Sequence, residues 1–116
     1  MKNFIAILVL LLASNVSMAS GRVVQCEIES GGEIVLSEKC RFNSAGNGSF
    51  YLSSIKKDQY LFNPIYSVSV DMTGDGVAEV SGDTGSNNSR WGKAIRSTDD
   101  EACWVGADFK VCAWSL

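Results

Sequence analysis

The clearest structural signal in the sequence is Tyr66-Ser67-Val68-Ser69-Val70-Asp71-Met72, where apolar and polar side chains alternate strictly over residues 66–72. Successive side chains of a β-strand point to opposite faces, so this alternation predicts a strand with one buried face and one face in water. The runs on either side are short, rich in β-branched and aromatic residues, and separated by Gly, Asn, Asp and Ser. The sequence therefore predicts an all-β domain.

Further strands are predicted on both sides of this stretch, over residues 22–30, 33–37, 49–55, 59–62, 102–106 and 109–114. Gly31-Gly32 separates the first two and suits a two-residue hairpin turn, because glycine adopts positive φ without strain. Residues 82–90 predict a polar loop, and the capping-box spacing of Thr98 and Glu101 favours a short helical turn. We expect a small antiparallel β-sandwich or barrel of about seven to nine short strands.

The first residues have the features of a secretory signal peptide. Lys2 supplies a positive charge, residues 4–13 are apolar, and residues 17–19 form a small-x-small cleavage site. The apolar run is much shorter than the roughly 20 residues that a membrane-spanning helix needs. We therefore expect residues 1–19 to be removed, residues 20–116 to form a single β domain, and the product to be periplasmic or secreted without membrane insertion.

Composition excludes several common functions. The chain has 116 residues, with 10 Lys and Arg against 13 Asp and Glu, a net charge of -3 and no His. An acidic chain of this kind disfavours nucleic acid as a partner. Without His, the usual Ser-His and Cys-His nucleophile pairs, His metal ligands and the commonest general base cannot form. These observations favour a protein that is not an enzyme.

Four cysteines in an exported domain predict two disulfides, because the number is even and the compartment is oxidising. If Ala107-Asp108 is a hairpin turn, Cys103 faces Cys112 at a non-hydrogen-bonded pair, where Cα atoms approach most closely. This register predicts a disulfide between Cys103 and Cys112. We also expect Trp104, next to Cys103 in the chain, to lie in the core and cover this disulfide.

The other disulfide follows by exclusion, since only Cys26 and Cys40 remain. With Gly31-Gly32 as the turn, regular pairing would place Cys26 opposite Ser37 and leave Cys40 just beyond the hairpin. A bulge or a loop must therefore bring Cys40 back toward Cys26.

A candidate cation site lies in the segment after the alternating strand. Oxygen ligands fall at every second position, from the side chains of Asp71, Thr73, Asp75 and Glu79 and the backbone carbonyl of Val77. The segment resembles the short Asp-x-Thr-Gly-Asp-Gly-x-x-Asp/Glu calcium loops that lie between strands in several exported β-proteins. This resemblance implies a bound calcium ion, although an EF-hand's bidentate Glu at position 12 is missing.

Hairpin register bears on the same site. Keeping Val70 opposite Val80 on the buried face places Asp71 opposite Glu79 on the other face. Like charges in direct opposition are destabilising, and a bound cation would remove this penalty. The alternative is that both carboxylates point into water around an ordinary turn.

Candidate partner contacts are expected around the predicted polar loop, at Asp83, Asn87, Asn88, Arg90 and Trp91. Arg and Trp beside an exposed loop are typical of energetically dominant positions in protein interfaces. The alternative is that Arg90 simply forms solvated ion pairs with nearby acids.

Residues 89–92, Ser-Arg-Trp-Gly, and residues 103–114, Cys-Trp-Val-Gly-Ala-Asp-Phe-Lys-Val-Cys-Ala-Trp, together resemble a group of small exported bacterial proteins without assigned activity. This resemblance implies export and a terminal disulfide hairpin. It implies no substrate and no catalytic residue.

These features favour a non-enzymatic exported binding protein. Within that class we expect an inhibitor or immunity protein, with a partner such as a peptidoglycan hydrolase, another envelope-directed enzyme or a toxin, because acidic loops complement a basic cleft. The alternative is a calcium-stabilised module that binds envelope carbohydrate through exposed aromatic side chains.

Overall fold

The computed structural model describes residues 21–116, and the predicted signal segment, residues 1–19, lies outside them. The described chain forms eight strands: β1 (Arg22–Ser30), β2 (Glu33–Gly46), β3 (Ser49–Ser53), β4 (Ser67–Gly74), β5 (Val77–Asp83), β6 (Asn88–Arg96), β7 (Cys103–Val105) and β8 (Phe109–Ser115).

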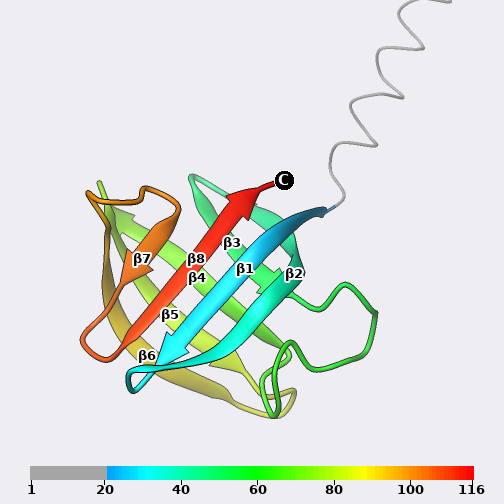
Figure 1. Cartoon of the computed structure of the whole chain (residues 1–116). Coiled ribbons are helices and arrows are strands. Elements are labelled where there is room, and N and C mark those ends of the chain that lie inside the picture. The colour runs from blue at the N-terminus through cyan, green and yellow to red at the C-terminus, as the bar shows by residue number, and fades with distance from the viewer. Residues whose placement is uncertain (1–20) are drawn as a thin grey trace, which may run out of the picture.

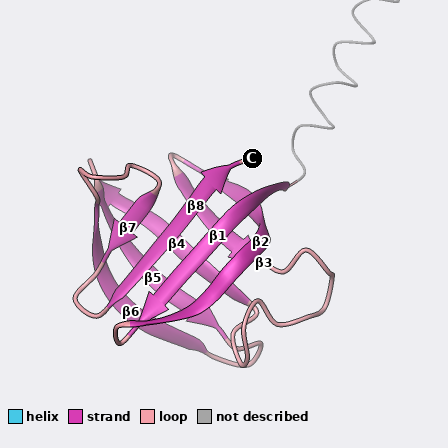
Figure 2. Ribbon diagram, viewed as in Figure 1, coloured by secondary structure: helices cyan, strands magenta, loops and turns pink. Residues whose placement is uncertain are grey.

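The strands form one closed antiparallel barrel in which each strand pairs with its neighbours in the chain and β8 pairs with β1 (Figure 1). This confirms the all-β prediction and selects the barrel over the sandwich. Colouring by secondary structure shows only strands and loops over residues 21–116 (Figure 2). In that part of the chain, therefore, no helix is long and apolar enough to span a membrane.

Three local predictions are wrong. Residues 59–62 are not a strand; they belong to the long β3–β4 loop, where Phe62 makes an isolated bridge to Ile65. Residues 82–90 are mostly strand, because β5 and β6 pair as far as Asp83 and Asn88. The expected helical turn near Thr98 does not form. Residues 97–102 are a bend and a turn, in which the Ser97 hydroxyl accepts the Asp99 and Asp100 N–H groups and the Asp100 carbonyl accepts the Cys103 N–H.

A bulge in the first hairpin brings the Cys26–Cys40 pair together. Glu29 pairs with Ile34 but Ile28 pairs with Leu36, so one extra residue sits between these positions on β2. The shift changes which β2 residues face the interior, and it puts Cys40 on the same side as Cys26. Cys26 therefore pairs with Glu38 rather than Ser37, and its disulfide to Cys40 runs diagonally across the strands with 5.8 Å between Cα atoms.

The predicted terminal hairpin is confirmed. Cys103 pairs with Cys112, their Cα atoms lie 4.1 Å apart, and the two residues form a disulfide. Trp104 is buried, as expected, but it does not cover this disulfide. Neighbouring residues of a strand point to opposite faces, so Trp104 enters the barrel interior while the Cys103–Cys112 bridge lies on the outer side.

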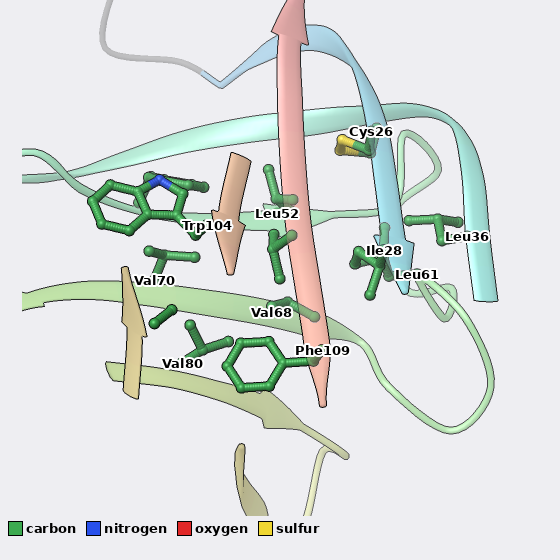
Figure 3. Close-up of a cluster of buried hydrophobic side chains, with 14 of the residues drawn as sticks. Cys26, Ile28, Leu36, Leu52, Leu61, Val68, Val70, Val80, Trp104 and Phe109 are labelled. Atoms are coloured by element: carbon green, nitrogen blue, oxygen red, sulfur yellow. A yellow bond between two sulfur atoms is a disulfide. The ribbon is translucent and has the colours of Figure 1, made fainter. Parts of the chain in front are cut away.

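The interior holds a single apolar cluster that includes Trp104, Leu52, Val70 and Phe109 (Figure 3). Its residues come from all eight strands and from the β3–β4 loop. The Cys26–Cys40 bridge belongs to this cluster, whereas the Cys103–Cys112 bridge does not.

Candidate functional site

One end of the barrel is sealed by its own chain. The β3–β4 loop inserts Leu61 and Ile65 into the interior, where each is only 6% exposed. Beside them the ring of Trp91 lies 5.6 Å from that of Phe109 and 6.3 Å from that of Phe62. These five side chains close the end of the barrel where β1 finishes and β8 begins.

The opposite end is open and contains a cavity of 720 Å³. Its walls mix polar backbone and side-chain groups with the apolar side chains of Phe42, Phe50, Met72, Trp104 and Ala113. Its edge carries four charged residues, Arg22, Asp75, Arg96 and Glu101. We call the cavity formed by these nine residues the barrel mouth.

Two tight turns keep the barrel mouth unobstructed. The β2–β3 turn is the dipeptide Asn47-Gly48, and both residues have positive φ, 55° and 84°. This is the backbone of a two-residue hairpin turn that matches the twist of the flanking strands, and Asn-Gly is its preferred sequence. The β4–β5 turn is similarly short because Gly76 takes a φ of 66°. Neither turn is long enough to fold over the cavity.

Both arginines of the barrel mouth lie against its aromatic walls. The guanidinium carbon of Arg22 is 4.9 Å from the ring centroid of Phe42, and that of Arg96 is 5.5 Å from the ring centroid of Trp104. Arg96 Nε also donates a 2.8 Å hydrogen bond to the backbone carbonyl of Glu101. These contacts place two cationic, planar groups beside apolar surface, an arrangement suited to an amphipathic ligand.

The β6–β7 loop, residues 97–102, forms part of the rim and is held by its own polar groups. Asp100 accepts hydrogen bonds from Trp114 Nε1, at 2.8 Å, and from the backbone N–H of Ala102, at 3.0 Å. These two bonds lower the pKa of the Asp100 carboxyl, and the bond from Trp114 has the larger effect. Asp99 and Glu101, on either side, remain exposed.

The candidate calcium ligands are not gathered around one point. Asp71 does pair with Glu79, as the register predicted, but both point outward from the barrel while Asp75 lines the mouth. The Thr73 hydroxyl donates to the Val77 carbonyl at 3.4 Å, so these two candidate ligands contact each other. Within residues 21–116, no three acidic, Cys or His side chains are close enough together to hold a metal ion.

Protein side chains supply positive charge beside the Asp71–Glu79 pair. Arg90 Nη2 lies 3.3 Å from Glu79 Oε1, and Lys93 pairs with Glu79 across the β5–β6 ladder. These two cations offset the repulsion between the Asp71 and Glu79 carboxylates without a bound ion, so this repulsion no longer supports a calcium ion. The calcium site stays a prediction.

The candidate partner contacts fall into two separate places. Asp83, Asn87 and Asn88 lie at the β5–β6 turn, where Asp83 Oδ1 accepts the Gly85 N–H at 2.8 Å. Arg90 lies on the outer surface with its side chain 83% exposed. Trp91 is half-buried in the sealed end of the barrel and does not share a surface with Arg90, although the two are adjacent in sequence. Neighbouring residues of a strand point to opposite faces, which accounts for this separation, and Trp91 is also the unpaired residue of a β-bulge between β5 and β6.

Sequence reasoning did not find the barrel mouth. Its residues come from the start of β1, the end of β8 and every second hairpin connection, so they are far apart in sequence. In an up-and-down barrel alternate turns lie at the same end, so the turn residues of the sequence could have been grouped by end. This grouping requires the strand order and the number of strands, which the sequence alone did not provide.

The fold and its cavity define a small, disulfide-linked, up-and-down β-barrel with one open end. Comparison with protein-family models, with curated proteins and with solved structures finds no significant match.

Proposed function

We propose that this protein is a non-enzymatic binding protein that receives a small amphipathic molecule in the barrel mouth. The observation that carries the proposal is the asymmetry of the barrel, which is plugged at one end by Leu61, Ile65 and Trp91 and open at the other. Eight strands enclose an interior just wide enough for side chains or for one small ligand. Filling one end with side chains leaves the other for a ligand.

The chemistry of the cavity supports this class of ligand. Small-molecule sites are typically about 300–1,000 Å³, mostly apolar, with a few polar groups that fix orientation. The barrel mouth has 720 Å³, aromatic walls and four charged residues at its edge. A small ligand with an apolar body against Phe42 and Met72 and a polar group at the charged edge fits this mixed lining.

The cellular compartment follows from the cysteines. Both disulfides are formed, which is consistent with an oxidising environment outside the cytoplasm. We propose that the protein acts in the periplasm or after secretion.

A fluorescent probe tests the proposed site. Anilinonaphthalene sulfonate, an apolar molecule with one polar group, should bind the oxidised protein at one site. Ala113→Trp places a large side chain in the barrel mouth and should weaken binding by about tenfold or more, because it fills the cavity. Ala107→Trp, in the β7–β8 turn at the sealed end, is the matched control and should bind normally.

Folding of each variant is checked by circular dichroism, and Met72→Trp offers a second way to fill the mouth if Ala113→Trp does not fold. Unchanged probe affinity in a folded, mouth-filled variant would overturn the proposal. So would the absence of a saturable probe site in the unmodified protein.

A second candidate function is favoured by the β6–β7 loop. Its fixed backbone presents Asp99 and Glu101 at the rim, and the chain carries a net charge of -3. These two exposed carboxylates complement the basic cleft of an envelope-directed enzyme such as a peptidoglycan hydrolase. By occupying such a cleft, the protein would act as an inhibitor or immunity protein.

Experiments can distinguish ligand binding in the barrel mouth from enzyme inhibition by the β6–β7 loop. An inhibitor should reduce the activity of a basic lysozyme at equimolar concentration, and its association should slow as salt rises. Asp99→Asn with Glu101→Gln should weaken inhibition, whereas Glu33→Gln with Glu38→Gln, the same charge change on β2, should not. Equal effects of the two pairs would exclude a specific role for the rim loop.

A further inference from the structure

A second cavity lies outside the barrel, between the β3–β4 loop and the neighbouring strands. It has a volume of 600 Å³ and is separate from the barrel mouth in every lining residue. Its cationic side chains are Arg41, Lys56 and Lys57. We call this cavity the loop groove. Figure 1 shows the β3–β4 loop standing away from the strands on one side of the barrel.

The loop groove is positively charged in an otherwise acidic chain. Three cations face it against one carboxylate, Asp58, although the whole chain has a net charge of -3. Within residues 21–116 the two ion pairs join Arg90 to Glu79 and Lys110 to Glu29, so the cations of the groove are not neutralised by protein carboxylates. The groove therefore attracts anions.

One of these cations is held in a fixed position. Arg41 Nη1 donates to the Gly21 carbonyl at 3.3 Å, and Arg41 Nη2 donates to the Ile55 carbonyl at 3.2 Å. The second bond attaches the first part of the loop to β2. A guanidinium has five N–H donors in a fixed plane, so further donors remain for a ligand.

The loop itself is well anchored. Leu61 and Ile65 hold its second half in the barrel, and the rings of Tyr60 and Tyr66 pack at a tilt of 38° with centroids 4.5 Å apart. A connection as long as residues 54–66 is uncommon in a small domain unless it has a function. An anchored loop that carries Lys56 and Lys57 is a suitable scaffold for a binding site.

The remaining lining residues are mixed in character. Hydroxyl and amide groups come from Ser53, Ser54, Ser67 and Gln59, Ile55 is apolar, and Tyr66 contributes an aromatic ring with a hydroxyl. The polar groups pair with ligand hydroxyls, and the aromatic ring packs against the apolar face of a sugar.

We infer that the loop groove binds an anionic saccharide, with the oxyanion held by Arg41, Lys56 and Lys57 and the sugar hydroxyls held by the polar side chains. Arginine and lysine recognise carboxylate and phosphate through charge-assisted hydrogen bonds, so either a uronate or a sugar phosphate supplies the required group. The site is independent of the barrel mouth and of any ligand bound there.

Calorimetric titration of the oxidised full protein tests this inference. The probes are trigalacturonate, glucose 6-phosphate and the neutral sugar maltotriose. Binding of either anionic probe with no binding of maltotriose is the expected result, and the preferred anion identifies the oxyanion. Absence of binding by both anionic probes, or equal binding of the neutral sugar, would overturn it.

Matched variants separate a built site from general charge attraction. Lys56→Gln with Lys57→Gln should lower the affinity by about tenfold or more, because two charge-assisted contacts are lost. Arg90→Gln with Lys93→Gln removes the same charge from the outer surface of β6 and should leave the affinity unchanged. An equal loss in both pairs would show that only net charge matters and would reject the site.

Discussion

Trp114 and Asp100 are joined by a 2.8 Å hydrogen bond, in which the indole Nε1–H on β8 donates to the carboxylate of the β6–β7 loop. This bond fixes the loop that forms the rim of the barrel mouth. It also lowers the pKa of Asp100, together with the bond from the Ala102 N–H.

The Trp114–Asp100 bond predicts a pH-dependent stability. A carboxyl with a lower pKa in the folded state stabilises the fold above its unfolded pKa, and this contribution disappears as pH falls through the folded pKa. For Asp100 the contribution is present above its usual value of 3.8 and is lost as the solution becomes more acidic. Trp114→Phe should therefore lower the melting temperature at pH 6, and the difference from the unmodified protein should shrink below pH 3.8.

Asp100→Asn is the control for this experiment, because an amide keeps an acceptor oxygen but does not titrate. The melting temperature of Asp100→Asn should itself lack the step that the Asp100 carboxyl causes in the unmodified protein below pH 3.8, and adding Trp114→Phe to it should give a difference that does not change with pH. A melting-temperature difference for Trp114→Phe that stays constant between pH 2 and pH 6 would contradict the assignment.

The bulge in the first hairpin predicts tolerance of a deletion. Val35 is the extra residue of β2, because Glu29 pairs with Ile34 and Ile28 pairs with Leu36. Removing Val35 leaves every other pair in place and should preserve the Cys26–Cys40 disulfide, which peptide mapping would detect. Deleting Ser69 from the regular strand β4 should prevent folding, since half of the strand would then reverse its inward and outward faces.

The two disulfides should differ in their contribution to stability. Cys26 and Cys40 pack within the interior cluster, whereas Cys103 and Cys112 lie outside it. Each bridge closes a short loop, so removing either by paired Cys→Ala changes should cost about 3 kcal/mol from chain entropy. The Cys26–Cys40 pair should cost slightly more, because it closes the longer loop, with a sequence separation of 14 against 9, whereas all four cysteines are buried and lose similar packing. Urea unfolding would measure both, and a smaller cost for Cys26–Cys40 would contradict the loop-length argument.

Gly82 should be sensitive to the addition of one methyl group. A Cβ at this position would lie 3.1 Å from Ile65 Cδ1 and 3.2 Å from Trp91 Nε1. Gly82→Ala should therefore destabilise the sealed end by about 1–3 kcal/mol and change the fluorescence of Trp91. Ser81→Ala, one position away on the outward face, should be nearly neutral. An unaltered melting temperature for Gly82→Ala would mean that Trp91 does not pack there.

Sequence patterns predicted the fold best where pairing is regular. The alternation over residues 66–72 gave the correct face and register of β4, and the turn at Ala107-Asp108 gave the Cys103–Cys112 pair by counting alone. Both cases depend only on the two-residue period of a strand and on a short turn.

Predictions failed where an extra residue shifts the register. The bulge at Val35 is an exception, because the need to pair Cys40 with Cys26 predicted a bulge or a loop there, and the structure has the bulge. The bulge at Trp91 has no such marker. Grouping Trp91 with Arg90 followed local composition and ignored that neighbouring strand residues face opposite sides, so it missed that Trp91 packs into the sealed end. The barrel mouth was missed for a different reason, since it exists only once the ring of strands is closed.

The position of the two disulfides has a consequence for how the ring of strands opens. Each bridge joins strands that are neighbours in the chain, β1 to β2 and β7 to β8. The seam between β8 and β1 joins opposite ends of the described chain and, over residues 21–116, has no covalent link across it. Backbone hydrogen bonds, interior packing and the 3.0 Å ion pair between Lys110 and Glu29 hold it closed. Because β6 and β7 share only two paired positions, against seven at this seam, the ring should open first between β6 and β7, beside the rim loop, while both cross-links stay intact.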